Sequence, residues 1–269
     1  MDMLCMDRRI APFLSIAMWM LACGASRSPA VKAPAAPPPE AASSATQPIS
    51  STHPDLDFSV VSKWHLCEKD DLGDCTLQCN RGHLPSCVRL GNIYLDGKLV
   101  PTDMAVAAQA YELPCDSHMG AACFNIGLIY ARKNDMGQAA AYYDRACKEG
   151  EPTGCAYLAD SYADGTGVTR DPARAAGLYD RACQAGELRS CSRLGTLYAL
   201  GTGVVKNGAT AVRLFEKACS GGNAGGCGNL GSSYKIGLGV PRDSRRAAQL
   251  YKQACDAGAK AYCDLVERR

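Results

Sequence analysis

The sequence lacks most of the patterns that mark an enzyme or a nucleic-acid-binding protein. Its formal net charge is only +2 over 269 residues, so no charge excess favours nucleic acid or an anionic membrane surface as a partner. It has no C-x-x-C redox pair and no C-x-x-C-H haem attachment site. Aromatic residues are few, at 7%, but cysteine occurs 16 times. An even number of regularly spaced cysteines is typical of an oxidising compartment.

An export signal is predicted at the N-terminus. Arg8 and Arg9 precede an apolar run at 10–22, whose thirteen residues suit a signal peptide and are too few to span a bilayer. The run ends in Leu21-Ala22-Cys23, which resembles a bacterial lipobox. We therefore predict a signal peptide at 1–22 and a lipidated Cys23, with ordinary secretion and a membrane-retained helix as alternatives. The expected location is the bacterial envelope, as a periplasmic or outer-membrane lipoprotein, or the extracellular space.

A low-complexity segment follows the signal. Residues 23–57 are rich in Ala, Pro and Ser and cannot bury enough apolar surface to fold. Proline stiffens such a segment toward an extended form. We expect a disordered tether at 23–57 and a folded region at 58–269.

The cysteines of the folded region define a repeat. They form seven C-x7-C pairs: Cys67/Cys75, Cys79/Cys87, Cys115/Cys123, Cys147/Cys155, Cys183/Cys191, Cys219/Cys227 and Cys255/Cys263. From Cys79 onward, the first cysteines recur after 36, 32, 36, 36 and 36 residues. A fixed period in the thirties indicates a solenoid of small helical units.

Two helices are predicted in each repeat. Helix A carries an L-G-x-x-Y block after each second cysteine: Leu90-Gly91-x-x-Tyr94, Ile126-Gly127-x-x-Tyr130, Leu158-Ala159-x-x-Tyr162, Leu194-Gly195-x-x-Tyr198 and Leu230-Gly231-x-x-Tyr234. A turn-like stretch then ends in an N-cap for helix B: Asp103, Asp135, Asp171, Asn207 and Asp243. Helix B carries an aromatic residue four before its cysteine: Tyr111, Tyr143, Tyr179, Phe215 and Tyr251.

Glycines are predicted to end helix B three residues past its cysteine, at Gly82, Gly150, Gly186, Gly222 and Gly258. His118 takes this place once, so we expect that turn to close differently. The second repeat is four residues short, which predicts a tighter A–B loop at 132–135 with intact helices. Residues 67–87 look like a compressed N-terminal repeat, and a helix at about 259–268 is expected to cap the C-terminal end.

These blocks resemble the Sel-one-like repeat (SLR) family, relatives of the tetratricopeptide repeats, over about residues 60–269. The paired cysteines look most like those of the cysteine-rich bacterial branch, which includes the HcpA-like β-lactamase proteins. The resemblance implies an all-α fold, a right-handed α/α solenoid (superhelix) of about five helical hairpins.

Structural disulfides, zinc binding and redox chemistry compete as roles for the cysteine pairs. Zinc sites favour cysteines two to four residues apart, which C-x7-C does not match. Along one straight helix the two cysteines would lie about 12 Å apart, too far for a disulfide, so the chain must turn between them. Each bridge would then close a nine-residue loop and stabilise the fold by about 2.6 kcal/mol on a chain-entropy estimate. We predict seven structural disulfides, no metal and no cofactor.

A variable polar stripe on helix A is the predicted binding face for a protein or peptide. The tetratricopeptide resemblance implies that helix A lines the binding groove, although a merely solvated helix face would look the same. Its proposed binding residues are Arg89, Asn92, Asn125, Tyr157, Asp160, Arg193 and Asn229. Arg and Asn bind carboxylates and backbone amides, which admits a peptide or a peptidoglycan stem peptide as ligand. The expected partners include no nucleic acid, and a membrane only through the lipid anchor.

An enzymatic alternative follows from the family resemblance, because cysteine-rich relatives are classed as β-lactamases or penicillin-binding proteins. Serine β-lactamases use S-x-x-K with S-D-N and K-T-G motifs. Ser232 and Lys235 match the first motif, but the other two are missing. The four histidines do not recur with the repeat, and His65 is interpreted as a helix-face residue. The residues therefore predict no catalytic site.

Overall fold

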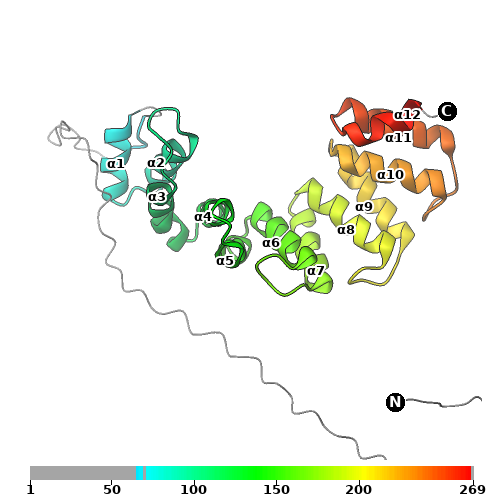
Figure 1. Ribbon diagram of the computed structural model, residues 1–269, viewed down its shortest axis with the longest axis horizontal. Coiled ribbons are helices and arrows are strands. Elements are labelled where there is room, and N and C mark those ends of the chain that lie inside the picture. Colours follow the sequence, from blue (N-terminus) through cyan, green and yellow to red (C-terminus); the bar gives the residue numbers. More distant parts are fainter. Residues whose placement is uncertain (1–64, 69–70, 268–269) are drawn as a thin grey trace, which may run out of the picture. The chain divides into compact units, whose positions relative to one another are not determined.

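The computed structural model describes residues 65–68 and 71–267, and all regular elements in these ranges are helices (Figure 1). In chain order they are α1 (Leu72–Asn80), α2 (Leu84–Asp96), α3 (Met104–Asp116), α4 (Gly120–Arg132), α5 (Met136–Lys148), α6 (Pro152–Asp164), α7 (Pro172–Gln184), α8 (Leu188–Leu200), α9 (Gly208–Ser220), α10 (Ala224–Ile236), α11 (Ser244–Asp256), the 3-10 turn η1 (Lys260–Tyr262) and α12 (Cys263–Glu267). These residues belong to one compact unit. The predicted signal peptide, Cys23 and the tether lie outside the described residues.

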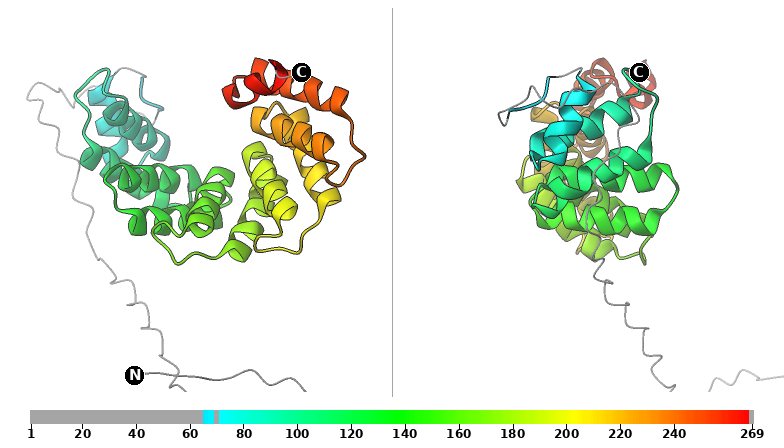
Figure 2. Two further views of the ribbon diagram at one scale, coloured as in Figure 1. Left: turned by 45° about the vertical axis from the view of Figure 1, so that its right-hand side comes forward. Right: turned by 90° about the vertical axis from the view of Figure 1, so that its left-hand side faces the viewer.

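Helices α2 to α11 form five hairpins, each made of one A helix and one B helix. The A helices are α2, α4, α6, α8 and α10, and the B helices are α3, α5, α7, α9 and α11. Each helix packs against the helices before and after it in the chain (Figure 2). The predicted all-α solenoid is therefore confirmed, and α1 takes the place of a B helix in the compressed N-terminal repeat.

The predicted caps start every B helix. Side-chain oxygens of Asp103, Asp135, Asp171, Asn207 and Asp243 accept hydrogen bonds from backbone N–H groups of the first helical turn. The backbone N–H of each cap also donates to the carbonyl of the preceding L-G-x-x-Y tyrosine, at 2.8–3.1 Å. The short second repeat keeps this bond, and α4 and α5 retain thirteen residues each. The tighter loop with intact helices is confirmed.

The small residue of each L-G-x-x-Y block is a packing position within its hairpin. A Cβ added at Gly127 would lie 2.6 Å from the Tyr143 ring, and one at Gly91 would lie 2.6 Å from the Tyr111 ring. Both rings are buried, at 4% and 0% exposure. The glycine lets the A and B helices approach closely enough for the ring to fill the space between them.

Seven disulfides join the C-x7-C pairs in the predicted register: Cys67–Cys75, Cys79–Cys87, Cys115–Cys123, Cys147–Cys155, Cys183–Cys191, Cys219–Cys227 and Cys255–Cys263. Their Cα–Cα distances are 4.4–4.9 Å, because the chain turns between the cysteines. From Cys79 onward, each bridge ties the end of one helix to the first turn of the next A helix, or of η1 and α12 at the end of the chain. The links therefore lie between successive hairpins.

The second cysteines of the internal bridges are buried core residues. Their exposure is only 0–1% at Cys87, Cys123, Cys155, Cys191 and Cys227. Each Sγ also lies 3.5–3.7 Å from the backbone carbonyl of its partner cysteine. A sulfur enclosed in this way is not within reach of a ligand or a redox partner. These five residues thus act as packing positions as well as bridges, a second role that the spacing alone did not predict.

The turn at His118 corrects one expectation. His118 adopts a left-handed backbone with φ 64°, as Gly150 does with φ 84° at the equivalent place. The same two hydrogen bonds close both turns, from His118 N–H to Cys115 and from Met119 N–H to Pro114 in the first of them. The turn at His118 is thus closed by the same hydrogen bonds as the glycine turn, and a non-glycine residue adopts the less favourable left-handed conformation there. The His118 ring lies 3.0 Å from a carboxylate oxygen of Glu149.

Loops of later hairpins cover the first turn of the preceding B helix. Gly167 packs against the backbone at Met136, and a Cβ there would clash with the Met136 carbonyl. The same contact recurs one and two repeats later, between Gly203 and Pro172 and between Gly239 and Gly208. This loop contact is a second link between hairpins, on a different element from the disulfides.

The C-terminal cap differs from the predicted single helix at 259–268. Residues 260–262 form the 3-10 turn η1, and α12 begins only at Cys263 and ends at Glu267. Tyr262 packs parallel to Tyr251, with ring centroids 5.8 Å apart. A ring in this position covers part of α11 with fewer residues than a full A helix would.

Candidate functional site

The predicted binding residues all lie on A helices, but the structure separates them into distinct groups. Arg89 and Asn92 are on α2, Asn125 on α4, Tyr157 and Asp160 on α6, Arg193 on α8 and Asn229 on α10. Tyr157, Asp160 and Arg193 meet around shared contacts, and Asn92 and Asn125 both hydrogen-bond the Tyr111 side chain. The others are held in contacts that link helices.

Asp160 is the centre of that shared group. Its carboxylate accepts hydrogen bonds from Arg189 Nη1 at 2.7 Å and from the Tyr179 hydroxyl. Arg193 Nε lies 3.9 Å from the same carboxylate. One acidic side chain on α6 therefore orients two arginines of α8 and a tyrosine of α7.

Tyr157 adds an aromatic surface beside these charges. Its ring lies 5.1 Å from Phe124 in an edge-on arrangement and 5.3 Å from Tyr143, between centroids. The Arg189 guanidinium lies 5.0 Å from its ring centroid, a cation–π distance. We call Tyr157, Asp160, Arg189 and Arg193 the central patch.

Charge and burial fix the protonation of the central patch. Burial lowers the pKa of the Arg189 guanidinium, but the charge and hydrogen bond of Asp160, together with Glu187 and Tyr157, outweigh burial and raise this pKa. Burial raises the pKa of Tyr179, and its hydrogen bond to Asp160 raises this pKa further. Arg189 is thus held as a cation and Tyr179 as a neutral donor. The side chain of Arg193 is 60% exposed and remains available to an incoming group.

Asn92 accepts a hydrogen bond between helices B and A that recurs along the chain. The tyrosine of helix B donates its hydroxyl to a polar residue of helix A nineteen positions earlier: Tyr111 to Asn92 at 2.6 Å, Tyr179 to Asp160 and Tyr251 to Ser232 at 3.2 Å. In the fourth hairpin, Phe215 has no hydroxyl, and the equivalent Thr196 bonds the Ser192 carbonyl instead. These polar residues hold the two helices of a hairpin together.

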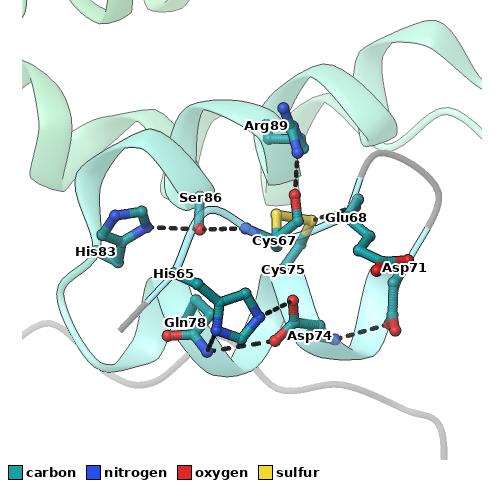
Figure 3. A network of polar contacts seen from close by, with 10 residues as sticks. All are labelled: His65, Cys67, Glu68, Asp71, Asp74, Cys75, Gln78, His83, Ser86 and Arg89. Atoms are coloured by element: carbon teal, nitrogen blue, oxygen red, sulfur yellow. Dashed lines mark hydrogen bonds and ion pairs between the residues drawn. A yellow bond between two sulfur atoms is a disulfide. The ribbon is translucent and has the colours of Figure 1, made fainter. Parts of the chain in front are cut away.

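Arg89 anchors the N-terminal segment (Figure 3). Its guanidinium donates to the carbonyl of Cys67, and the Cys67 N–H donates to Ser86 Oγ at 3.1 Å. His83 Nδ1 lies 2.7 Å from the same hydroxyl. Both backbone groups of Cys67 are therefore bound to α2 or its N-cap, and Arg89 has a structural role at this end.

His65 lies outside any helix, which corrects its interpretation as a helix-face residue. Its Nε2 is 2.9 Å from Asp74 and its Nδ1 is 3.3 Å from the Gln78 amide nitrogen, both on α1 (Figure 3). The ring fastens the segment 65–68 onto α1. No group of His, Cys, Asp and Glu able to hold a metal occurs among the described residues.

Asn229 and Asn125 also make contacts inside the fold. Asn229 donates to Ser192 Oγ on α8 at 3.1 Å and accepts from the Tyr262 hydroxyl at 3.1 Å. The Asn125 side chain hydrogen-bonds Tyr111, which partly opposes the rise that burial gives to the pKa of Tyr111. Both asparagines therefore connect neighbouring elements.

The Ser232 hydroxyl uses both its donor and its acceptor function in hydrogen bonds within the fold, which does not suit a nucleophile. Its hydroxyl donates to the Gly228 carbonyl at 3.0 Å and accepts the Tyr251 hydroxyl. A nucleophilic serine needs its proton directed at a base. Lys235 is exposed at the end of α10, and among the described residues no hydrogen bond joins it to Ser232. The S-x-x-K match therefore has no catalytic geometry here.

The polar stripe predicted from the sequence does not include Arg189, which contacts both Tyr157 and Asp160. It stands two residues before the second cysteine, where the other repeats have Pro85, Ala121, Thr153 and Gly225. Because no basic residue recurs there, periodicity gives no signal for it. Only the contact between α6 and α8 identifies it.

Comparison with known proteins agrees with the helical hairpins. The Sel1 repeat model matches five consecutive segments, at 84–113, 118–151, 152–187, 188–223 and 225–258. Cytochrome c oxidase assembly factor 7A of Xenopus laevis is 30% identical over 103 residues, which are 35% of this chain and 45% of that protein. The chain thus matches less than half the length of this curated relative.

Two solved structures are also similar. The protective antigen c5321 of uropathogenic Escherichia coli, which displays an SLR fold, is 28% identical with a TM-score of 0.66, covering 71% of this chain and 43% of that one. Cysteine rich protein B of Helicobacter pylori is 33% identical with a TM-score of 0.41, covering 49% of this chain and 98% of that one. Since the repeat model matches more than half of the residues, the chain belongs to the Sel1 repeat family.

Proposed function

We propose that this protein is an exported, lipid-anchored scaffold that binds a protein or peptide partner in the bacterial cell envelope. Sel1 repeat proteins mediate protein–protein interaction, which supports the binding role. The observation that carries the proposal is the central patch, where Arg193 is 60% exposed beside a carboxylate that already has two closer donors. A cation that its own fold does not fully use can bind a ligand anion.

The chemistry of the patch selects the ligand class. An arginine guanidinium binds a carboxylate through two parallel N–H donors, and the neighbouring Tyr157 ring offers apolar contact area. A peptide segment with a carboxylate next to an apolar side chain can contact both the guanidinium and the ring. A protein C-terminus, an acidic loop and the stem peptide of peptidoglycan all belong to this class.

The binding test uses the full chain and a charge reversal. We expect Arg193→Glu to abolish retention of the envelope partner on immobilised protein and to reduce binding of purified stem peptide by about tenfold or more in calorimetry. Arg213→Glu, an exposed position on helix α9, is the matched control and should bind like wild type. Equal binding by both variants would remove the central patch from the proposal.

Export and anchoring are supported by the disulfides and the N-terminal pattern. Seven disulfides indicate an oxidising environment. Among the described residues, no helix is long and apolar enough to cross a bilayer. Metabolic labelling with a fatty-acid probe should mark the wild type and not Cys23→Ala. An unlabelled wild type found in the medium would instead favour ordinary secretion.

The contacts of Ser232 favour a non-enzymatic role. Its proton is used on a backbone carbonyl, and its acceptor site is used by Tyr251. We expect no nitrocefin turnover by the purified protein, with or without Ser232→Ala. Turnover that disappears in this variant would establish the β-lactamase alternative.

A further inference from the structure

Within residues 71–267, helix α11 lacks a cover that the B helices α5, α7 and α9 have. In those helices, the loop of the next hairpin lies on the first turn, at Met136, Pro172 and Gly208. An apolar residue four positions further on is buried under it in each case: Ala140 at 2%, Ala176 at 5% and Val212 at 4% exposure. The residues that pack over this region include the L-G-x-x-Y tyrosine and the loop valine of the next hairpin, such as Tyr162 and Val168.

In α11 the equivalent positions line an open pocket. Ser244 takes the place of Met136, Pro172 and Gly208, and it is exposed, while Ala248 is only half-buried. The pocket has a volume of about 450 Å³ and is lined by Lys235, Ser244, Arg245, Ala247, Ala248, Tyr251, Leu265 and Val266. Among the described residues, no loop covers this turn. We call this pocket the α11 pocket.

The sequence of α12 does not continue the L-G-x-x-Y pattern of the A helices. Val266 stands in the register of the L-G-x-x-Y leucine, and position 267 is the register of its small residue. In the five hairpins that place holds glycine or alanine, and a Cβ at Gly231 would already lie 2.9 Å from the Tyr251 ring. Position 267 holds glutamate in this sequence, a much larger residue than glycine or alanine, so the L-G-x-x-Y pattern is not continued there.

The lining of the α11 pocket defines the chemistry of its occupant. The floor is apolar, formed by Ala247, Ala248, Tyr251, Leu265 and Val266. The rim carries Lys235 and Arg245, both exposed, and neither forms an ion pair with a described carboxylate. Unpaired cations beside an apolar floor complement a helix that has an apolar side chain and carboxylates on one face.

We propose that the α11 pocket binds an acidic amphipathic helix of a partner protein, which inserts an aromatic or branched side chain over Ala248. The partner continues the interface that the next hairpin supplies to α5, α7 and α9. The pocket involves different helices from the central patch on α6 and α8, so it is a second binding site. The two sites allow one scaffold to hold two partners.

The test uses the full chain and a peptide that copies an internal cover. The probe is a helix-stabilised, fluorescently labelled peptide of residues 156–171, AYLADSYADGTGVTRD, which contains Tyr162, Val168 and the carboxylates of Asp160 and Asp164. We expect saturable binding in fluorescence anisotropy. Arg245→Glu should weaken binding about tenfold or more by reversing a rim charge, and Ala248→Trp should do so by filling the pocket.

Matched controls separate binding at the α11 pocket from binding elsewhere on the chain. Arg213→Glu should leave peptide affinity unchanged, and a probe with Tyr162→Ser should bind weakly. Circular dichroism should show that Arg245→Glu and Ala248→Trp keep the wild-type helix content. Wild-type affinity in both pocket variants, or no binding of the helix-stabilised probe, would overturn the proposal.

Two further measurements identify a different occupant. A concentration-dependent dimer in sedimentation velocity, abolished by Ala248→Trp, would assign the pocket to a second copy of this chain and overturn a partner helix. Co-flotation of the chain with phosphatidylglycerol vesicles, lost in Arg245→Glu but not in Arg213→Glu, would assign it to a membrane surface. A monomeric chain whose flotation does not change in Arg245→Glu, and that still binds the probe, supports the proposal.

Discussion

The Tyr111 hydroxyl donates a 2.6 Å hydrogen bond to Asn92 Oδ1, which joins the B and A helices of the first hairpin. Tyr111 is fully buried, and the same donor–acceptor pairing recurs nineteen residues apart in two later hairpins. A polar residue of helix A that looks variable and solvent-facing in the sequence therefore has a structural partner.

Removing the acceptor should cost more than removing the hydroxyl. Tyr111→Phe removes the hydroxyl together with its hydrogen bonds to Asn92 and Asn125, and we expect the free energy of unfolding to fall by about 0.5–1.5 kcal/mol. Asn92→Ala leaves the buried hydroxyl without this acceptor and should cost about 1–3 kcal/mol. Urea unfolding followed by circular dichroism measures both. Thr196→Ala, opposite Phe215, is the control and should cost less than Asn92→Ala.

Two glycine-to-alanine substitutions should change the free energy of unfolding in opposite directions. Gly127→Ala places a Cβ 2.6 Å from the buried Tyr143 ring, so we expect a loss of about 1–3 kcal/mol. Gly177→Ala, in the middle of α7, places its Cβ where nothing lies within 4 Å, and the better helix former should add up to about 1 kcal/mol. Thermal unfolding of the two variants compares them directly. A stabilised Gly127→Ala would show that the helices of this hairpin can separate without cost.

A single inter-hairpin disulfide should contribute substantially to stability. The double variant Cys147→Ala with Cys155→Ala removes the link between α5 and α6, and we expect a loss of about 2–5 kcal/mol. The urea midpoint measures it, and mass spectrometry after alkylation should find no free thiol in the folded region of the wild type. Removal of Cys67 and Cys75 is a useful comparison, because that bridge ties only the terminal segment to α1. A midpoint unchanged by either double variant would contradict a stabilising role.

Much of the fold could be predicted from the sequence because the same capping, packing and cysteine positions recur in successive repeats. Caps such as Asp171, ring positions such as Tyr179 and the cysteine register recur, so several copies support each assignment. The prediction that the turn at His118 closes differently was wrong. A histidine at this position does not indicate that the backbone adopts the left-handed conformation that glycine adopts in the other repeats. The central patch was only partly predicted. Tyr157, Asp160 and Arg193 belong to the stripe, whereas Arg189 acts through a contact between hairpins that periodicity cannot reveal.

Alkaline pH should weaken the fold through its buried tyrosines. Burial raises the pKa of Tyr143 to about 12, and the neighbouring Tyr157 contributes to the rise. The unfolded chain ionises near pH 10 while the folded chain resists, so this contribution to stability is complete below pH 10 and is lost as pH rises through about 12. We expect the wild type to lose about 1–2 kcal/mol more than Tyr143→Phe between pH 9 and 11. Urea midpoints of both proteins across that range measure the difference. Parallel curves would show that the Tyr143 hydroxyl ionises as easily in the folded chain as in the unfolded one.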